Sequence, residues 1–256
     1  MDIDITTDGH VHTKYCGHAS GEMEEYIVAA LGNGLKRLIF LEHFEAGINY
    51  FESTWLSPEK FLQFRQEGET LREKYKGKII VGLGVEVGFN PLCIDEIKDF
   101  LRAHAWDRVG LSCHFFYHEG KHVNMLSRKK ANLAEFTSIG IGKVLDEYFN
   151  NLLQAVDQIP ANVLCHLDAV LRHHDQVRFD KRHLKLIRTI LQHAAERQIA
   201  LEVNTSGFPL RGEPFPSLSI LKMAQKQGLD LVAGSDAHRP RDVGRFFDRL
   251  PRLLDS

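Results

Sequence analysis

The stretch RLIFLEH, residues 37–43, decides the fold of this chain. Its first five residues are a near-continuous apolar run of strand length, and Glu42 and His43 follow where that run ends. A run of this kind indicates a strand buried on both faces, as in a parallel sheet. Stretches with helical periodicity flank it, at residues 23–35 and again after the start signal Ser57-Pro58. The local order is therefore helix, buried strand, helix.

The same alternation continues along the chain. Strands are expected at residues 3–5, 37–41, 79–85, 108–113, 162–165, 199–203 and 230–233. Helices are expected at residues 23–35, 57–75, 94–104, 141–159, 180–197, 216–227 and 241–254. Buried strands that alternate with helices predict an α/β protein with a parallel sheet. At 256 residues, a single closed (β/α) TIM-like barrel over residues 1–256 fits better than two domains.

Composition excludes several classes of protein. A hydrophobic fraction of 43% with 26% charged residues is ordinary globular composition, and no apolar run approaches the roughly 18 residues of a membrane span. The net charge of −2 argues against a general surface for nucleic acid. Four cysteines without close pairing do not form a disulfide framework, and the acidic N-terminus does not resemble a signal peptide. We expect a cytoplasmic protein.

Histidine and carboxylate side chains follow six of the seven expected strands. The active-site groups of a (β/α) barrel lie where strands end, so these side chains should meet at one rim. Nine of them are candidate metal ligands: His10, His12, His18, His43, Glu86, His114, His166, Asp236 and His238. Nine ligands are too many for one ion and suit a cluster of two or three divalent cations. If these residues had only structural roles, their placement at six strand ends would need six independent explanations.

The spacing within two of these segments supports the metal interpretation. Alternate residues of an extended segment point the same way, so His10 and His12 can face one ion, and Asp236 with His238 repeats the pattern. Cys16 remains open as a soft ligand. Cys113 and Cys165 each precede a candidate ligand and are expected to point out of the barrel. A contribution to the rim also remains open for His118 and His122.

These motifs, in this order, resemble those of the polymerase and histidinol phosphatase (PHP) family. DGHVH at residues 8–12 is similar to its first motif, Glu42-His43 to its second, His114 to its third, and GSDAH at residues 234–238 to its last. The segment NTSG at residues 204–207 and those around His166 and Arg211 resemble the histidinol-phosphate phosphatase branch. The resemblance implies a distorted seven-stranded (β/α) barrel with a trinuclear site and a role in histidine biosynthesis.

The resemblance also implies roles for individual residues. One ion would take His10, His12, Glu86 and Asp236; a second would share Glu86 and add His114 and His166; a third would take His18, His43 and His238. The ions would be zinc, manganese or iron, and Arg172 and Arg211 would hold the substrate phosphate. A hydroxide bridging two ions would attack phosphorus, with Glu86 and Asp236 catalytic through the metals. His238 or a second metal-bound water would protonate the leaving alkoxide.

The implied substrate is a small-molecule phosphate monoester, with L-histidinol phosphate as the first candidate. Aromatic residues of two loops are expected to line its pocket: Tyr50, Phe51, Trp55, Phe115, Phe116 and Tyr117. A PHP phosphodiesterase or nuclease is the main alternative, since Arg128-Lys129-Lys130 could form a local basic patch. An amidohydrolase-like deacylase and a catalytically silent metal-binding module are weaker alternatives. The oligomeric state stays open.

Overall fold

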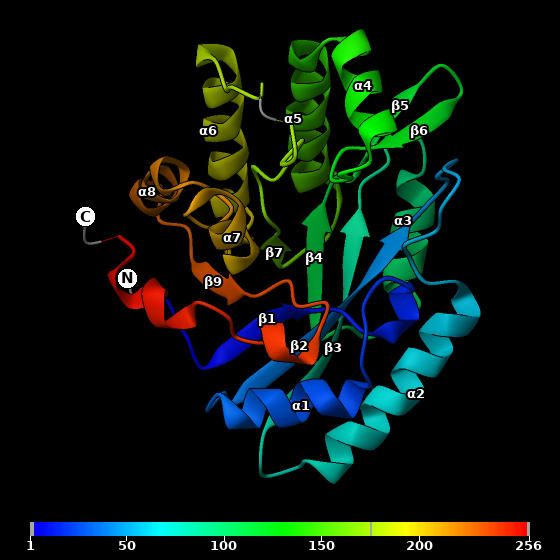
Figure 1. Ribbon diagram of the computed structural model, residues 1–256, viewed down its shortest axis with the longest axis vertical. Helices are drawn as coiled ribbons and strands as arrows, with labels where there is room; N and C mark the ends of the chain where they lie inside the picture. Colours follow the sequence, from blue (N-terminus) through cyan, green and yellow to red (C-terminus); the bar gives the residue numbers. More distant parts are fainter. Residues whose placement is uncertain (1–2, 175, 255–256) are drawn as a thin grey trace.

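Seven parallel strands form one curved sheet in the computed structural model, which describes residues 3–174 and 176–254 (Figure 1). The strand order is β1-β2-β3-β4-β7-β8-β9. Their bounds are β1 Thr7–Val11, β2 Arg37–Glu45, β3 Ile80–Gly88, β4 Arg108–Ser112, β7 Val163–Leu164, β8 Ala200–Asn204 and β9 Leu231–Gly234. The two edge strands meet through isolated parallel bridges, Val11 with Ala237 and Asp4 with Val232. The sheet is therefore a distorted, nearly closed barrel, and the predicted α/β fold is confirmed.

Helices follow the strands and cover the outside of the sheet (Figure 1). They are α1 Met23–Gly32, α2 Pro58–Lys74, α3 Ile94–Arg102, α4 Lys130–Ile139, α5 Ile141–Gln158, α6 Lys181–Glu196, α7 Phe208–Arg211 and α8 Leu218–Lys226. Helix α2 begins where predicted because the Ser57 side chain accepts a hydrogen bond from the Lys60 amide and Pro58 occupies the first turn. Asp180 caps α6 in the same way.

Apolar side chains fill part of the inside of the ring below the rim. Leu41, Val163 and Cys165 form a buried cluster there. Glycines on β3 and β4 leave room for it: a Cβ at Gly84 would lie 2.8 Å from a Leu41 methyl, and one at Gly110 would lie 2.7 Å from Cys165 Sγ. The lumen is thus packed with side chains, and Arg108 also lies in it, with its Nη1 donating to the Gly9 carbonyl.

Cys165 corrects one expectation, because its side chain lies inside the ring rather than outside. The period-two alternation breaks just after it: His166 has a φ of 24°, so the backbone turns and carries the imidazole to the rim as well. Cys113 behaves as expected and is buried in the outer core.

Both ends of the chain differ from the prediction. Residues 3–5 form only a bridge at Asp4, because the Asp4 carboxylate accepts hydrogen bonds from Thr6 and Thr7 and turns the chain, so that β1 begins at Thr7. The helix expected over residues 241–254 is replaced by short 3₁₀ turns, η3 Pro240–Asp242 and η4 Phe247–Arg252. Positive φ angles at Gly244 and Phe246 break any continuous helix there.

Residues 114–140, for which no strand or helix was expected, form a hairpin and a helix. Strands β5 Phe115–His118 and β6 Lys121–Asn124 pair antiparallel across a turn at Glu119 and Gly120, which both have positive φ. Figure 1 shows this hairpin beside α4 at the upper right. The hairpin lies beyond the carboxyl end of β4 and supplies part of the wall of the site described below.

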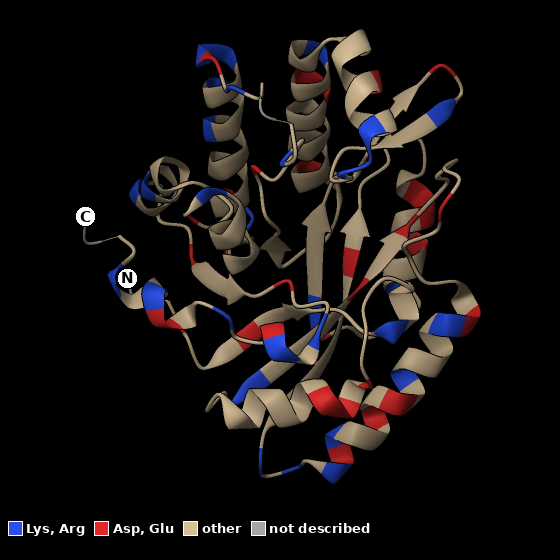
Figure 2. Cartoon of the chain, in the orientation of Figure 1, with Lys and Arg blue, Asp and Glu red and all other residues tan. Residues whose placement is uncertain are grey.

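Charged residues of both signs are spread over the helices, and both signs are interspersed along α2 (Figure 2). Most of the strand ribbon in Figure 2 is uncharged, as the buried strands require. Within the described residues, no helix has the length and apolar character needed to cross a membrane.

Candidate metal centre

The carboxyl ends of the strands bring all nine predicted ligands to one rim. Glu86, a fully buried residue of β3, is the centre of this group. Its Oε1 lies 2.8 Å from His166 Nε2 and 3.1 Å from His114 Nε2. Its Oε2 lies close to three more imidazoles: His43 Nδ1 at 2.9 Å, His10 Nε2 at 3.4 Å and His12 Nε2 at 3.7 Å. Five imidazoles therefore surround one carboxylate.

A second part of the group joins the two ends of the chain. His238 Nε2 lies 2.8 Å from His18 Nε2 across 220 residues of sequence, and the Nδ1 atoms of these rings lie 3.0 Å and 3.3 Å from the carbonyl oxygens of Asp236 and Cys16. A ring that donates from Nδ1 to a carbonyl has its lone pair on Nε2. Two lone pairs thus face each other, an arrangement that a cation would stabilise.

The surroundings of these two rings favour the neutral form that binds metals. His18 lies exposed at the rim, but desolvation by the neighbouring groups, aided by the charge of His43, lowers its pKa to about 3. Burial likewise lowers the pKa of His238 to about 4, against the opposing effect of Asp236. Cys16 Sγ and the ring nitrogens of these two histidines lie within 4.8 Å of one another, so its role as a further ligand stays open. Burial raises the pKa of the Cys16 thiol to about 12.

The remaining candidate ligands have atoms whose arrangement bound cations would stabilise. His12 Nδ1 and Glu86 Oε2 are buried without a hydrogen-bond partner among the described residues. His10 Nε2 lies only 3.0 Å from His12 Nε2, and His12 Nε2 lies 3.3 Å from Asp236 Oδ1. Buried polar atoms are normally paired, so unpaired atoms in a cluster of imidazoles and carboxylates fit divalent metal ions. This donor set is the observation that supports a metal centre.

Two carboxylates behind the ligands were missed by the sequence analysis. Glu202 Oε1 lies 2.6 Å from His10 Nδ1, and Glu45 Oε1 lies 2.6 Å from His114 Nδ1. Burial opposes protonation of His114, but Glu86 and Glu45 raise its pKa to about 10. Such outer carboxylates fix the tautomer and orientation of a ligating ring. Glu202 had a sequence signal, since it interrupts the otherwise apolar run of β8.

Two of the ligands occupy unusual backbone conformations. The φ angles of His166 and Asp236 are 24° and 51°, a region that residues with a Cβ rarely adopt. Strain of this kind persists where the surrounding structure holds the residue in place, and it concentrates at functional sites. Burial raises the pKa of Asp236, but the hydrogen bond from His12 and the charge of His238 together lower it well below its ordinary value.

The two predicted phosphate-binding arginines have different surroundings. Arg172 lines the cavity above the cluster, its Nη1 lies 3.7 Å from Asp236 Oδ2, and its buried Nε has no hydrogen-bond partner among the described residues. Arg211 forms a two-pronged pair with Asp168, at 3.0 Å for each bond, and is not among the lining residues. Its guanidinium lies over the Phe215 ring. Binding of phosphate by Arg211 stays a prediction. Arg172, in contrast, has a hydrogen-bond donor, its Nε, that is unpaired within the described residues.

The cavity has a volume of about 470 Å³, with the histidine cluster as its floor. Of the six aromatic residues expected to line it, Tyr50 and Phe115 do so, with their ring centroids 5.3 Å apart. Trp55 packs against Phe115 from behind, at 5.8 Å. The other three point elsewhere, since Phe116 is buried in the core and Phe51 and Tyr117 are exposed.

His118 and His122, which the sequence left open, do not line the cavity. His122 instead holds the neighbouring loop: its Nδ1 accepts a hydrogen bond from the Asn49 amide at 3.0 Å, and its own amide donates to the Asn49 carbonyl. The ring thereby fixes one wall of the cavity.

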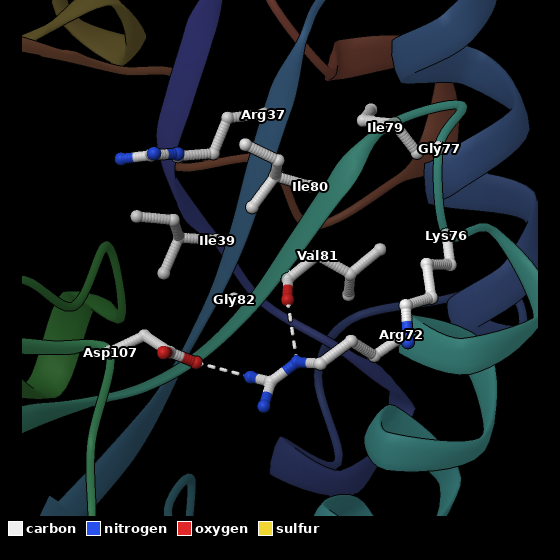
Figure 3. A pocket seen from close by; sticks show the side chains of 10 residues that line it. All are labelled: Arg37, Ile39, Arg72, Lys76, Gly77, Ile79, Ile80, Val81, Gly82 and Asp107. Atoms are coloured by element: carbon white, nitrogen blue, oxygen red, sulfur yellow. Dashed lines mark hydrogen bonds and ion pairs between the residues drawn. The ribbon is translucent and has the colours of Figure 1, made fainter.

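A separate cavity of about 440 Å³ lies near the amino ends of β2 and β3 (Figure 3). Arg72 dominates it, and its guanidinium is already bonded to Asp107 and the Val81 carbonyl. None of its lining residues is a histidine, so it lacks the donors of the rim.

Comparisons with known proteins agree with this geometry. The family model described as PHP domain matches residues 8–206, and one described as PHP-associated matches residues 219–252. The chain belongs to the PHP domain family. The first match ends after β8 and the second contains β9, so both contribute to the same sheet.

Several relatives and solved structures are similar along almost the whole chain. A probable histidinol-phosphatase of Deinococcus radiodurans is 28% identical over 254 residues, which is 97% of this chain and 92% of that protein. A histidinol-phosphatase of Bacillus subtilis is 25% identical, covering 94% of this chain and 96% of that protein. A putative histidinol phosphatase structure from Listeria monocytogenes has a TM-score of 0.86 at 21% identity, over 95% of this chain and 99% of that one.

Another similar solved structure contains bound molecules. The histidinol phosphate phosphatase of Lactococcus lactis, complexed with zinc, L-histidinol and phosphate, has a TM-score of 0.73 at 20% identity, over 97% of this chain and 92% of that one. The curated relatives place this chain in the histidinol-phosphatase-like branch, among phosphoric monoester hydrolases, as expected from the sequence. The cluster itself supports divalent metal binding.

Proposed function

We propose that this protein hydrolyses L-histidinol phosphate to L-histidinol and inorganic phosphate, with two or three divalent ions at the rim. The observation that carries the proposal is Glu86, a buried carboxylate contacted by five imidazoles on the floor of a substrate-sized cavity. The names of the relatives support the substrate, and the zinc of the Lactococcus lactis enzyme supports the metal.

The residues present would divide the ions between them. We assign one ion to His10, His12, Glu86 and Asp236, a second to Glu86, His114 and His166, and a third to His18, His43 and His238, with zinc, manganese or iron as the metal. Bound divalent ions would supply positive charge against the phosphate and lower the pKa of water for attack on phosphorus. Glu202 and Glu45 would hold His10 and His114 with their Nε2 lone pairs directed at the site.

Arg172 provides the clearest substrate contact from the chain itself. Its unpaired Nε and the adjacent Nη2 form a planar edge that matches two phosphate oxygens, while Nη1 faces Asp236. At its present position the guanidinium is near Asp236, so a phosphate bound there would lie beside the metal ligands. His238 is neutral and its Nε2 is assigned to an ion, so a second metal-bound water would be our candidate for protonating the leaving alkoxide.

The aromatic wall supports an organic group of limited size. Tyr50 and Phe115 present ring surfaces to the cavity, and offset stacking against an imidazole would add about 0.5–1.5 kcal/mol beyond burial. A small heteroaromatic phosphate ester therefore suits the site better than a long polymer.

The experiment is a comparison of substrates with purified, metal-analysed protein. We expect turnover of L-histidinol phosphate and of p-nitrophenyl phosphate, and loss of both after a chelator removes the metal. The phosphodiesterase alternative rests on Arg128 and Lys129, which line the same cavity. Faster hydrolysis of bis(p-nitrophenyl) phosphate than of the monoester would favour that alternative, and an absence of phosphatase activity in the metal-loaded protein would refute the proposal.

A further inference from the structure

The cavity contains one acidic side chain that the metal centre does not use. Three carboxylates of the described residues line it, and two of them, Glu86 and Asp236, are surrounded by imidazoles. The third is Glu52, which comes from the loop between β2 and α2. An acidic side chain beside a phosphate site repels a phosphate dianion. A carboxylate in this position can instead pair with a cationic group on the organic half of the substrate.

Glu52 already has a cationic partner, but a replaceable one. Its carboxylate forms an ion pair with Lys129 Nζ, and the two side chains are 47% and 45% exposed. Ion pairs this exposed contribute about 0–1 kcal/mol, so exchange of one ammonium for another costs little. Lys129 Nζ also lies 4.6 Å from the centroid of the Phe51 ring, where its charge would still be stabilised after leaving the carboxylate.

The backbone around Glu52 is held in place, so the carboxylate has a defined position. On the amino-terminal side, Asn49 is bonded to His122 of the hairpin, and the Tyr50 hydroxyl accepts a hydrogen bond of 2.9 Å from Asn132 Nδ2. The same Tyr50 ring contributes to the aromatic wall. Glu52 therefore lies beside the surface where the organic group of a substrate would pack.

We propose that Glu52 determines specificity by binding an ammonium group on the organic half of the phosphate ester, which displaces Lys129 Nζ from the carboxylate. This inference rests on the proposed phosphatase activity and refines it. Esters with an amine near the phosphate gain an ion pair with Glu52 while Lys129 stays beside the Phe51 ring, whereas amine-free esters leave Glu52 paired with Lys129 and gain nothing there. The enzyme thus prefers amino-alcohol phosphates.

The test compares two substrates that differ only in the amine: L-histidinol phosphate and 3-(imidazol-4-yl)propyl phosphate. In the Glu52→Gln variant, we expect the ratio of kcat/KM for the aminated ester to that for the amine-free ester to fall about tenfold, mainly through KM. Glu52→Asp, which keeps the charge, should restore part of the ratio. Glu135→Gln is the matched control, because Glu135 pairs with Lys121 of the same hairpin at 2.9 Å but does not line the cavity.

The results distinguish failure of the proposed phosphatase function from failure of the proposed role of Glu52. If wild-type protein loaded with metal hydrolyses neither ester, the proposed function is wrong. If it hydrolyses both and Glu52→Gln leaves their ratio within twofold of wild type, or if Glu135→Gln changes the ratio equally, the role of Glu52 is refuted. Thermal unfolding checks that each variant is folded, and Glu52→Ala gives a second removal of the charge if the glutamine variant is unstable.

Discussion

Glu202 provides a direct test of how the fold prepares the metal centre. Its Oε1 lies 2.6 Å from His10 Nδ1, while Oε2 accepts hydrogen bonds from the His166 amide at 2.9 Å and from Asn204 Nδ2 at 3.0 Å. In Glu202→Gln the side-chain amide must direct its NH₂ either at His10 or at the other two donors. The first choice forces the His10 proton onto Nε2 and removes the ligand lone pair, and the second leaves buried donors facing each other.

The magnitude follows from these alternatives. Changes in groups that orient a metal-bound histidine weaken metal affinity about 10- to 100-fold, or about 1.4–2.7 kcal/mol. A buried donor without an acceptor costs about 1–3 kcal/mol of folding stability as well. We therefore expect both weaker metal binding and a lower melting temperature in the metal-free protein.

The assay is titration of metal-free protein with Zn²⁺ or Mn²⁺ in competition with a chromophoric chelator, which gives both stoichiometry and Kd. Asp168→Asn is the control, because Asp168 is a buried carboxylate that pairs with an arginine, Arg211, rather than with an imidazole. That variant should lose stability while keeping its metal affinity. Unchanged metal affinity in Glu202→Gln, or an equal loss in Asp168→Asn, would show that the carboxylate does not prepare His10 for metal.

Three further predictions follow from the site. Replacing His10 or Asp236 by alanine should reduce bound metal and lower kcat by several orders of magnitude, and unchanged turnover in either purified variant would remove the metal-centre proposal. Arg172→Ala should raise KM for phosphate esters about tenfold or more with metal content intact, as measured by steady-state kinetics and elemental analysis; loss of metal would instead assign Arg172 a structural role. Burial lowers the pKa of His122, so its stabilising contribution should be full above about pH 6.5 and decline as pH falls, because the unfolded state then binds the proton more readily. The protection factor of the Asn49 amide, which corrects for the slower intrinsic exchange at low pH, should fall on acidification in wild type, and an equal fall in His122→Ala would contradict this assignment.

The elements that the sequence predicted well are those with a local cause. Strand β2 and helix α2 were placed within a few residues, because an apolar run and the Ser57-Pro58 start signal act over short distances. The helix expected at residues 241–254 was wrong, since periodicity alone does not show that Gly244 and Phe246 adopt positive φ. The hairpin after β4 was missed because its Glu119-Gly120 turn is a weak local signal.

The candidate site also combines features with a local cause and features that depend on the tertiary structure. The sequence by itself determined which side chains could bind metal, because ligand chemistry belongs to the residue and period-two spacing fixes the direction of neighbours such as His10 and His12. Only closure of the barrel brought His18 to His238 across 220 residues, and placed Glu202 behind His10 across 192. It also decided that Arg211 pairs with Asp168 while Arg172 faces the cavity. Such contacts depend on the packing of distant elements, which no local pattern of residues records.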